Sequence, residues 1–94
     1  MDIASQIAQI LLSTKAVKIS INPPFTWTSG IRSPIYCDNR LLISFPKERE
    51  QIVDAFCELV KVLKPDWVAG TATAGIPWAS FVAYQLKIPI IYVR

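Results

Sequence analysis

Three stretches of the chain carry apolar residues at helical spacing. The first covers residues 3–13, with Asp2 in position to cap it. The second covers residues 46–64, with Pro46 suited to a first turn, and its wide apolar face is made of Ile52, Val53, Phe56, Leu59, Val60 and Leu63. The third covers residues 76–87. We therefore expect three helices, of which the second is the longest.

Apolar and polar residues alternate between the first two helices. Residues 17–21 (VKISI) alternate as a half-buried strand does, and residues 25–30 (FTWTSG) alternate again before a Ser-Gly turn signal. The prolines of NPP at 22–24 interrupt the first strand, and residues 33–40 (SPIYCDNR) are expected to be extended. Residues 17–43 are therefore predicted to form a small antiparallel meander.

The last third of the chain predicts a βαβ unit. Residues 66–70 (DWVAG) are expected to form a short apolar strand, and residues 89–94 (PIIYVR) are apolar on both faces, as buried parallel strands are. Two parallel strands do not make a stable sheet, and parallel sheets are covered on both faces. We therefore expect the 94 residues to be the front part of a longer α/β protein. A compact two-stranded domain completed by a partner is the alternative.

Composition narrows the classes of function. The chain is 52% hydrophobic and 18% charged, so its surplus apolar surface needs a partner subunit or further sequence as cover. No apolar run reaches the ~18 residues of a membrane helix, and the N-terminus lacks the features of a signal peptide. Ten basic and seven acidic residues are scattered singly, which disfavours a nucleic-acid stripe and suits a small anionic ligand.

The cysteines and histidines limit the chemistry further. The chain has two cysteines, Cys37 and Cys57, and no histidine. No metal-ligand spacing is present, and a Cys–His nucleophile pair cannot be built from this sequence. Free thiols in a reducing cytoplasm are the default interpretation, and a disulfide is the alternative.

Residues 69–77 (AGTATAGIP) lack large side chains although bulky apolar runs flank them. They lie where a strand ends and a helix begins, and ligands of open α/β sheets bind beyond the carboxyl ends of strands. Small residues let a ligand approach the backbone, whose N–H groups and helix dipole favour an anion such as phosphate. Thr71 and Thr73 add hydroxyl donors. The loop has neither a Walker lysine nor the dinucleotide glycine spacing, so a tight turn without a ligand is an equally weighted alternative.

Two segments resemble the orotate phosphoribosyltransferases, a family of type I phosphoribosyltransferases. Residues 66–94 (DWVAGTATAGIPWASFVAYQLKIPIIYVR) resemble the family's pyrophosphate-loop region, and residues 25–40 (FTWTSGIRSPIYCDNR) resemble its N-terminal hood. The resemblance implies an α/β fold with a parallel sheet flanked by helices and a small antiparallel hood. Residues 1–45 would be the N-terminal helix and hood. Residues 46–94 would be the first part of the core, ending after its second strand.

The resemblance also implies binding roles. Phosphoribosyl pyrophosphate would be bound by Thr71, Ala72, Thr73, Ala74, Gly75 and Arg94. The bond between Ala72 and Thr73 would be a cis peptide, and Arg94 would reach the substrate across a dimer interface. Orotate, stacked on an aromatic ring, would be bound by Tyr36, Cys37 and Thr28. The hood turn would be shaped by Ser29, Gly30, Ser33 and Pro34.

Two departures from the family pattern concern charge. Many members carry a lysine where Thr28 stands and another where Ala74 stands. Other members with the SPIYCDNR motif also lack these lysines, which indicates a subfamily. The positive charge that contacts the pyrophosphate must then come from residues at other positions.

The implied activity is transfer of phosphoribosyl from phosphoribosyl pyrophosphate to orotate, giving orotidine 5′-monophosphate and pyrophosphate in pyrimidine (UMP) synthesis. Mg²⁺ would be carried by the pyrophosphate of the substrate, and no metal ligand is expected in the chain. The family's mobile loop and acidic signature lie beyond Arg94, so no catalytic residue is expected in this stretch, which alone should be inactive. The resemblance also implies a cytoplasmic homodimer with shared active sites, without nucleic-acid or membrane partners.

Two other classes of function stay open. Proteins of the same fold bind phosphoribosyl pyrophosphate as an effector and act on nucleic acid. A winged DNA-binding region should then precede the sheet, and none is visible in residues 1–45. The third class is a non-catalytic dimerisation fragment, which the surplus apolar surface would support. Binding of phosphoribosyl pyrophosphate or orotate discriminates among the three.

Overall fold

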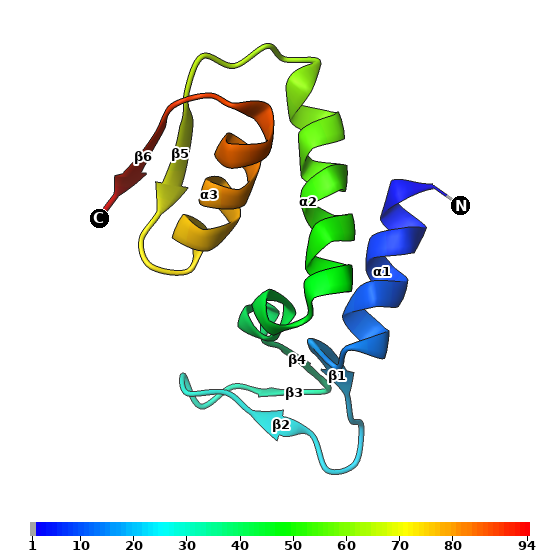
Figure 1. Ribbon diagram of the computed structural model, residues 1–94. Coiled ribbons are helices and arrows are strands. Elements are labelled where there is room, and N and C mark those ends of the chain that lie inside the picture. Colours follow the sequence, from blue (N-terminus) through cyan, green and yellow to red (C-terminus); the bar gives the residue numbers. More distant parts are fainter. Residues whose placement is uncertain (1) are drawn as a thin grey trace. The chain divides into compact units, whose positions relative to one another are not determined.

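The computed structural model describes residues 2–94 and divides the chain into two compact units, the first ending at Pro46 and the second covering Lys47–Arg94 (Figure 1). The first unit contains α1 (Ile3–Ser13), β1 (Val17–Ile19), β2 (Phe25–Thr26), β3 (Arg32–Ser33), β4 (Ile35–Cys37) and a 3₁₀ helix (Asn39–Ser44). The second is made of α2, which begins at the boundary (Pro46–Lys61), β5 (Val68–Thr71), α3 (Gly75–Leu86) and β6 (Ile90–Val93).

The helix α1 confirms both the predicted helix and its predicted cap. The Asp2 carboxylate accepts a hydrogen bond from the Ser5 backbone N–H at 2.8 Å. This bond satisfies one of the N–H groups that a first helical turn leaves open, and it lowers the pKa of Asp2. At the other end, the Thr14 hydroxyl donates to the Ile10 carbonyl at 2.7 Å.

The antiparallel strands form two nested ladders, so the predicted meander was wrong in its pairing. β1 pairs with β4, and β2 pairs with β3, which places the β2–β3 hairpin inside the β1–β4 pair along the sequence (Figure 1). Proline has no backbone N–H to donate to a ladder. Pro23 and Pro24 therefore separate β1 from β2, and Pro34 separates β3 from β4. The last bond of the outer ladder runs from the Ser20 N–H to the Pro34 carbonyl at 2.7 Å. The Asn22–Pro23 peptide is cis.

The segment after β4 was also predicted wrongly, because it is helical rather than extended. Residues Asn39–Ser44 form a 3₁₀ helix. The Asp38 carboxylate caps it by accepting a hydrogen bond from the Arg40 backbone N–H at 3.3 Å. A side chain that bonds to a backbone group two residues later favours a turn over a strand.

The βαβ unit is confirmed. β5 and β6 pair in parallel, with Val68 opposite Ile90 and Thr71 opposite Val93, and α3 connects them. The preceding helix α2 ends at Lys61, three residues before the predicted end. Lys64 adopts a positive φ of 49° immediately before a proline, which disfavours helical backbone in the residue that precedes it.

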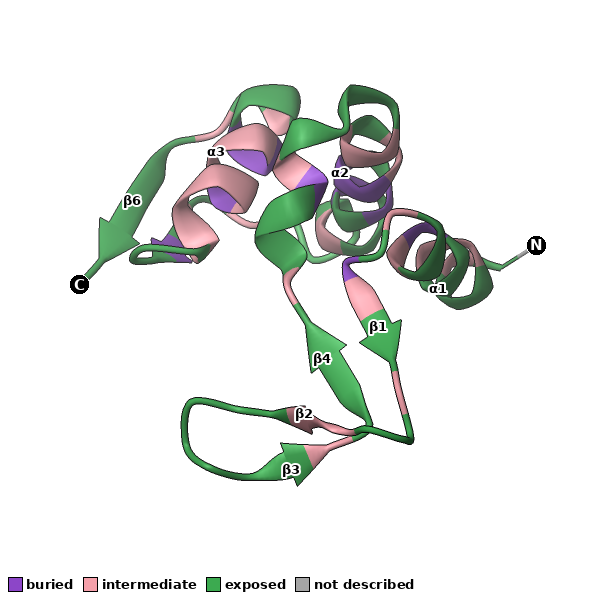
Figure 2. Cartoon of the chain, turned by 90° about the horizontal axis from the view of Figure 1, so that it is seen from below, coloured by how far each residue is buried: buried purple, intermediate pink, exposed green. Residues whose placement is uncertain are grey.

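The core of the second unit lies on α2 and α3. Val53, Cys57 and Val82 form its buried cluster, and the partly buried side chains packed against it are Val68, Trp78, Phe81 and Leu86. Figure 2 shows the buried positions of the two helices and, in contrast, β6 exposed along its whole length. The sequence indicated a buried strand at β6. It is exposed because β5 is the only strand that pairs with it in residues 2–94.

Candidate functional site

The residues expected to bind phosphoribosyl pyrophosphate lie at the carboxyl end of the parallel pair. The loop from Thr71 to Gly75 leaves β5 and enters α3. The backbone N–H of Ala72 donates to the Val93 carbonyl at 2.7 Å, and the N–H of Ile76 donates to the Thr73 carbonyl at 3.2 Å. The loop is thus held to the end of β6 at one side and to the first turn of α3 at the other.

One feature of this loop matches what the resemblance implied, and a second was found in the structure. The Ala72–Thr73 peptide is cis, as expected. Ala74 occupies the N-cap position of α3, and no side chain makes a capping hydrogen bond there. The first N–H groups of a helix need an external partner when a side chain does not cap them, and the positive end of the helix dipole favours an anion.

A close contact between strand and helix sets the position of the loop. A Cβ atom built on Gly70 would lie 2.8 Å from the Ala79 Cβ and 2.9 Å from the Gly75 carbonyl oxygen. Only glycine allows β5 and the first turn of α3 to approach this closely. At Gly75, by contrast, a Cβ atom would lie 3.7 Å from the Gly70 carbonyl carbon and from the Thr71 Cβ, which are ordinary contacts.

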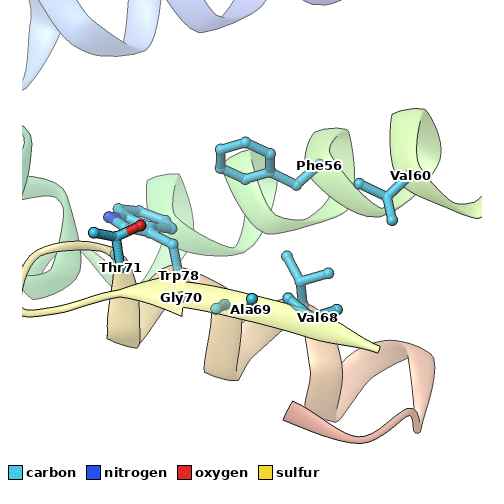
Figure 3. Close-up of a pocket in the computed structure, with 10 residues that line it drawn as sticks. Phe56, Val60, Val68, Ala69, Gly70, Thr71 and Trp78 are labelled. Atoms are coloured by element: carbon cyan, nitrogen blue, oxygen red, sulfur yellow. The ribbon is translucent and has the colours of Figure 1, made fainter. Parts of the chain in front are cut away.

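A hollow of about 300 Å³ lies beside the loop, within the second unit. Figure 3 shows Phe56 and Val60 of α2 above β5, with Trp78 and Thr71 toward one end. Its walls are mostly apolar, and the hydroxyl of Thr71 is the polar group that links it to the loop. The hollow therefore does not suit phosphate, which leaves the loop backbone as the candidate anion site.

Arg94 follows β6 directly and is exposed. Thr71 pairs with Val93, so the residue after β6 and the first residues of the loop lie at the same edge of the sheet. The structure therefore brings Arg94 and the loop together at the level of the backbone.

The residues expected to bind orotate belong to the first unit. Tyr36 is the central residue of β4, its ring centroid lies 5.8 Å from that of Phe25, and the residue is 41% exposed. Cys37 is the next residue, and its thiol bonds to the Asn39 side-chain oxygen at 3.2 Å. Adjacent strand residues point to opposite faces. One pocket can therefore receive the ring of Tyr36 and the backbone of Cys37, but not both side chains.

Thr28 lies in the tight turn between β2 and β3. The Gly30 N–H donates to the Trp27 carbonyl at 2.8 Å, and Gly30 has a φ of 90°, a conformation that favours glycine. The Trp27 indole N–H donates to the Ile35 carbonyl at 3.1 Å, which ties the turn to β4. The Ser33 hydroxyl accepts a hydrogen bond from the Ile35 N–H at 3.2 Å on the other side of Pro34.

A charged pair follows Tyr36 along the chain. The Arg40 Nε lies 2.9 Å from one oxygen of Asp38, and its terminal nitrogen lies 3.3 Å from the other. This bidentate contact lowers the pKa of Asp38 and raises that of Arg40. Lys18, which the sequence did not single out, lies opposite Tyr36 in the β1–β4 ladder. The pairing of β1 with β4 is the observation that brings Lys18 to Tyr36.

Neither metal ligands nor a membrane span is found in the part of the chain that the structure describes. Residues 2–94 contain no group of three or more His, Cys, Asp or Glu side chains able to hold a metal ion. None of the described helices has both the length and the apolar character to cross a bilayer.

No family model matches the chain. The orotate phosphoribosyltransferases of Coxiella burnetii and Listeria monocytogenes are each 53% identical to the chain over 96 residues, covering 100% of it and 46% of each relative. The crystal structure of orotate phosphoribosyltransferase from Aeropyrum pernix matches with a TM-score of 0.76 and 32% identity, over 94% of this chain and 52% of that one. Leishmania donovani UMP synthase matches with a TM-score of 0.78 and 28% identity, over 97% and 20%.

These comparisons confirm the resemblance and the fold. The similarity extends over the whole chain, and the α/β architecture is that of part of a type I phosphoribosyltransferase. The chain spans less than half the length of the curated relatives it matches.

Proposed function

We propose that the protein carrying this sequence is an orotate phosphoribosyltransferase, which converts orotate and phosphoribosyl pyrophosphate into orotidine 5′-monophosphate and pyrophosphate. The observation that carries the proposal is the bare β5–α3 loop with its uncapped helix start, in a chain 53% identical to enzymes of that name. The activity stays a proposal because the chain spans 46% of those relatives.

The loop is proposed to hold the pyrophosphate group. Backbone N–H groups of Thr73 and Ala74 and the hydroxyl of Thr71 would bind its oxygens, together with the N-terminus of α3. These groups are preorganised because the Ala72 N–H donates to the Val93 carbonyl on one side and the Ile76 N–H donates to the Thr73 carbonyl on the other. The departing pyrophosphate gains negative charge as the glycosidic bond breaks. Donors aimed at that charge stabilise the transition state.

The hood is proposed to hold orotate. The exposed part of the Tyr36 ring offers a flat surface on which the pyrimidine ring can stack, and Cys37 would contribute its backbone. Thr28 would supply a hydroxyl from the β2–β3 turn. Arg94 is proposed to bind phosphoribosyl pyrophosphate across a dimer interface, in a homodimer with shared sites.

Mg²⁺ is proposed to arrive as part of the substrate. Mg²⁺ is commonly bound through substrate phosphates and water rather than by an all-protein cage, and when bound it neutralises part of the pyrophosphate charge. The loop offers N–H and hydroxyl groups and no carboxylate, which fits a metal held by the substrate. The protein is further proposed to work in pyrimidine synthesis in the cytoplasm.

The test is an orotate-consumption assay on the complete protein that carries this sequence, with phosphoribosyl pyrophosphate and Mg²⁺. Thr71→Val removes the loop hydroxyl that is proposed to bind the pyrophosphate and keeps the side-chain shape, and we expect it to raise the KM for phosphoribosyl pyrophosphate by roughly 10-fold. Thr26→Val, at the exposed position of β2, is the matched control and should leave this KM unchanged. Binding of phosphoribosyl pyrophosphate without orotate consumption would contradict the enzyme and favour a regulator.

A further inference from the structure

Lys18 and Tyr36 lie directly opposite each other in the β1–β4 ladder. Opposite residues of an antiparallel pair project from the same face of the sheet, with Cβ atoms about 4.5–5.5 Å apart. The Lys18 side chain is exposed, and Tyr36 keeps 41% of its surface exposed beside Phe25. An ammonium group and an open aromatic ring therefore share one face of the hood.

The charges around this face leave Lys18 as the available cation. In residues 2–94 the recorded ion pair is that between Arg40 and Asp38, so Lys18 has no carboxylate within 4.0 Å. Asp38 alone would repel an anion from this face, but the bidentate contact with Arg40 offsets its charge. The pKa of Asp38 is lowered mainly by its hydrogen bond to Arg40, and the positive charge of Lys18 makes a smaller contribution in the same direction.

We infer that Lys18 binds the carboxylate of the flat anion that stacks on Tyr36. The inference rests on the proposed function, under which that anion is orotate. It assigns a specificity residue, because the charge of Lys18 would distinguish a ring with a carboxylate from the same ring without one. Thr28, another hood position expected to face orotate, carries no charge and cannot supply this discrimination.

The experiment measures the Kd and KM for orotate and for its uncharged methyl ester in the complete protein. Lys18→Gln should weaken orotate binding by about 10-fold or more, which is the range for a lost charge-assisted hydrogen bond. Binding of the ester and the KM for phosphoribosyl pyrophosphate should stay within about twofold of the unmodified protein, a change too small for the loss of such a bond. Lys18→Arg keeps the charge and should retain most of the affinity. Arg32 is an exposed cation on β3, and Arg32→Gln is the matched control. This variant should change the affinity for neither orotate nor the ester.

Three outcomes would overturn the inference. If Lys18→Gln keeps its orotate affinity and the unmodified enzyme is active, Lys18 does not bind the carboxylate, and the proposed function stays intact. Equal losses for orotate and the ester would show a structural effect instead of a charge effect. An unmodified protein that binds phosphoribosyl pyrophosphate but neither binds nor consumes orotate would overturn the proposed function, and this inference with it.

Discussion

Substitution of Gly70 by alanine is the sharpest test of how the candidate loop is held in place. The added Cβ would lie 2.8 Å from the Ala79 Cβ, whereas carbon atoms in good contact lie about 3.5–4.0 Å apart. Two further neighbours are backbone atoms, the Gly75 oxygen at 2.9 Å and the Ile76 Cα at 3.2 Å, which cannot rotate away. Either β5 or the start of α3 must therefore move.

The expected magnitude follows from two opposing terms. Overpacking of a close contact costs about 1–3 kcal/mol. Replacing glycine by alanine also restricts the unfolded chain, which returns about 0.4–1 kcal/mol. We therefore expect Gly70→Ala to lower the free energy of unfolding by roughly 1–2 kcal/mol. Urea unfolding followed by tryptophan fluorescence measures it, since Trp78 packs against the core of this unit.

Gly75→Ala is the matched control on the same loop. Its Cβ would meet ordinary contacts at 3.7 Å or more, and alanine is favoured over glycine in a helix by about 1 kcal/mol. This variant should be as stable as the unmodified protein or more stable. The double variant Gly70→Ala with Ala79→Gly should show favourable coupling but incomplete rescue, because the Gly75 oxygen remains in the way. Equal stability of Gly70→Ala and the unmodified protein would refute the reasoning.

Two further predictions concern titratable groups. The folded-state pKa of Asp2 is lowered by its bond to Ser5, so the cap stabilises the fold above the unfolded pKa of the carboxyl and is lost as pH falls through the folded pKa. Asp2→Ala should therefore reduce stability at pH 7 and flatten its dependence on acid, as measured by urea unfolding at several pH values; an unchanged acid dependence would contradict the cap. Burial raises the pKa of the Cys57 thiol, whereas Cys37 is exposed. A thiol reagent at pH 7.5 should therefore modify Cys37 first and Cys57 only on addition of urea, as followed by peptide mass. Comparable rates of modification of the two thiols in the folded protein would contradict this prediction.

Local patterns predicted those parts of the fold that depend on neighbours in sequence. The helix α1 and its Asp2 cap were predicted because they depend on spacing within about a dozen residues. The βαβ unit was predicted because each of its three elements has a clear pattern of its own, and a helix that connects two strands favours their parallel pairing. The hood was predicted less well, because the sequence does not show which of several short strands pairs with β1, and this choice depends on where prolines interrupt the strands. The 3₁₀ helix after β4 depends on one Asp38 side chain, and strand-like composition concealed it.

The candidate site divides in the same way. The loop residues are consecutive, so a lack of side chains and a resemblance were enough to identify them, including the cis peptide between Ala72 and Thr73. Lys18 was not identified, because its relation to Tyr36 exists only through the ladder. The binding roles of Tyr36 and Arg94 stay predictions until substrate affinities are measured.

The exposure of β6 has a consequence for solubility. Its residues IIYV are hydrophobic and all exposed, and they carry no charge that would discourage another strand from pairing along them. Short segments of this kind are templates for intermolecular β-sheet and fibril formation. The flanking Pro89 and Arg94 are of the types that act as gatekeepers against such growth. When residues 1–94 are expressed by themselves, they should aggregate in a concentration-dependent manner. Ile91→Lys should delay that aggregation.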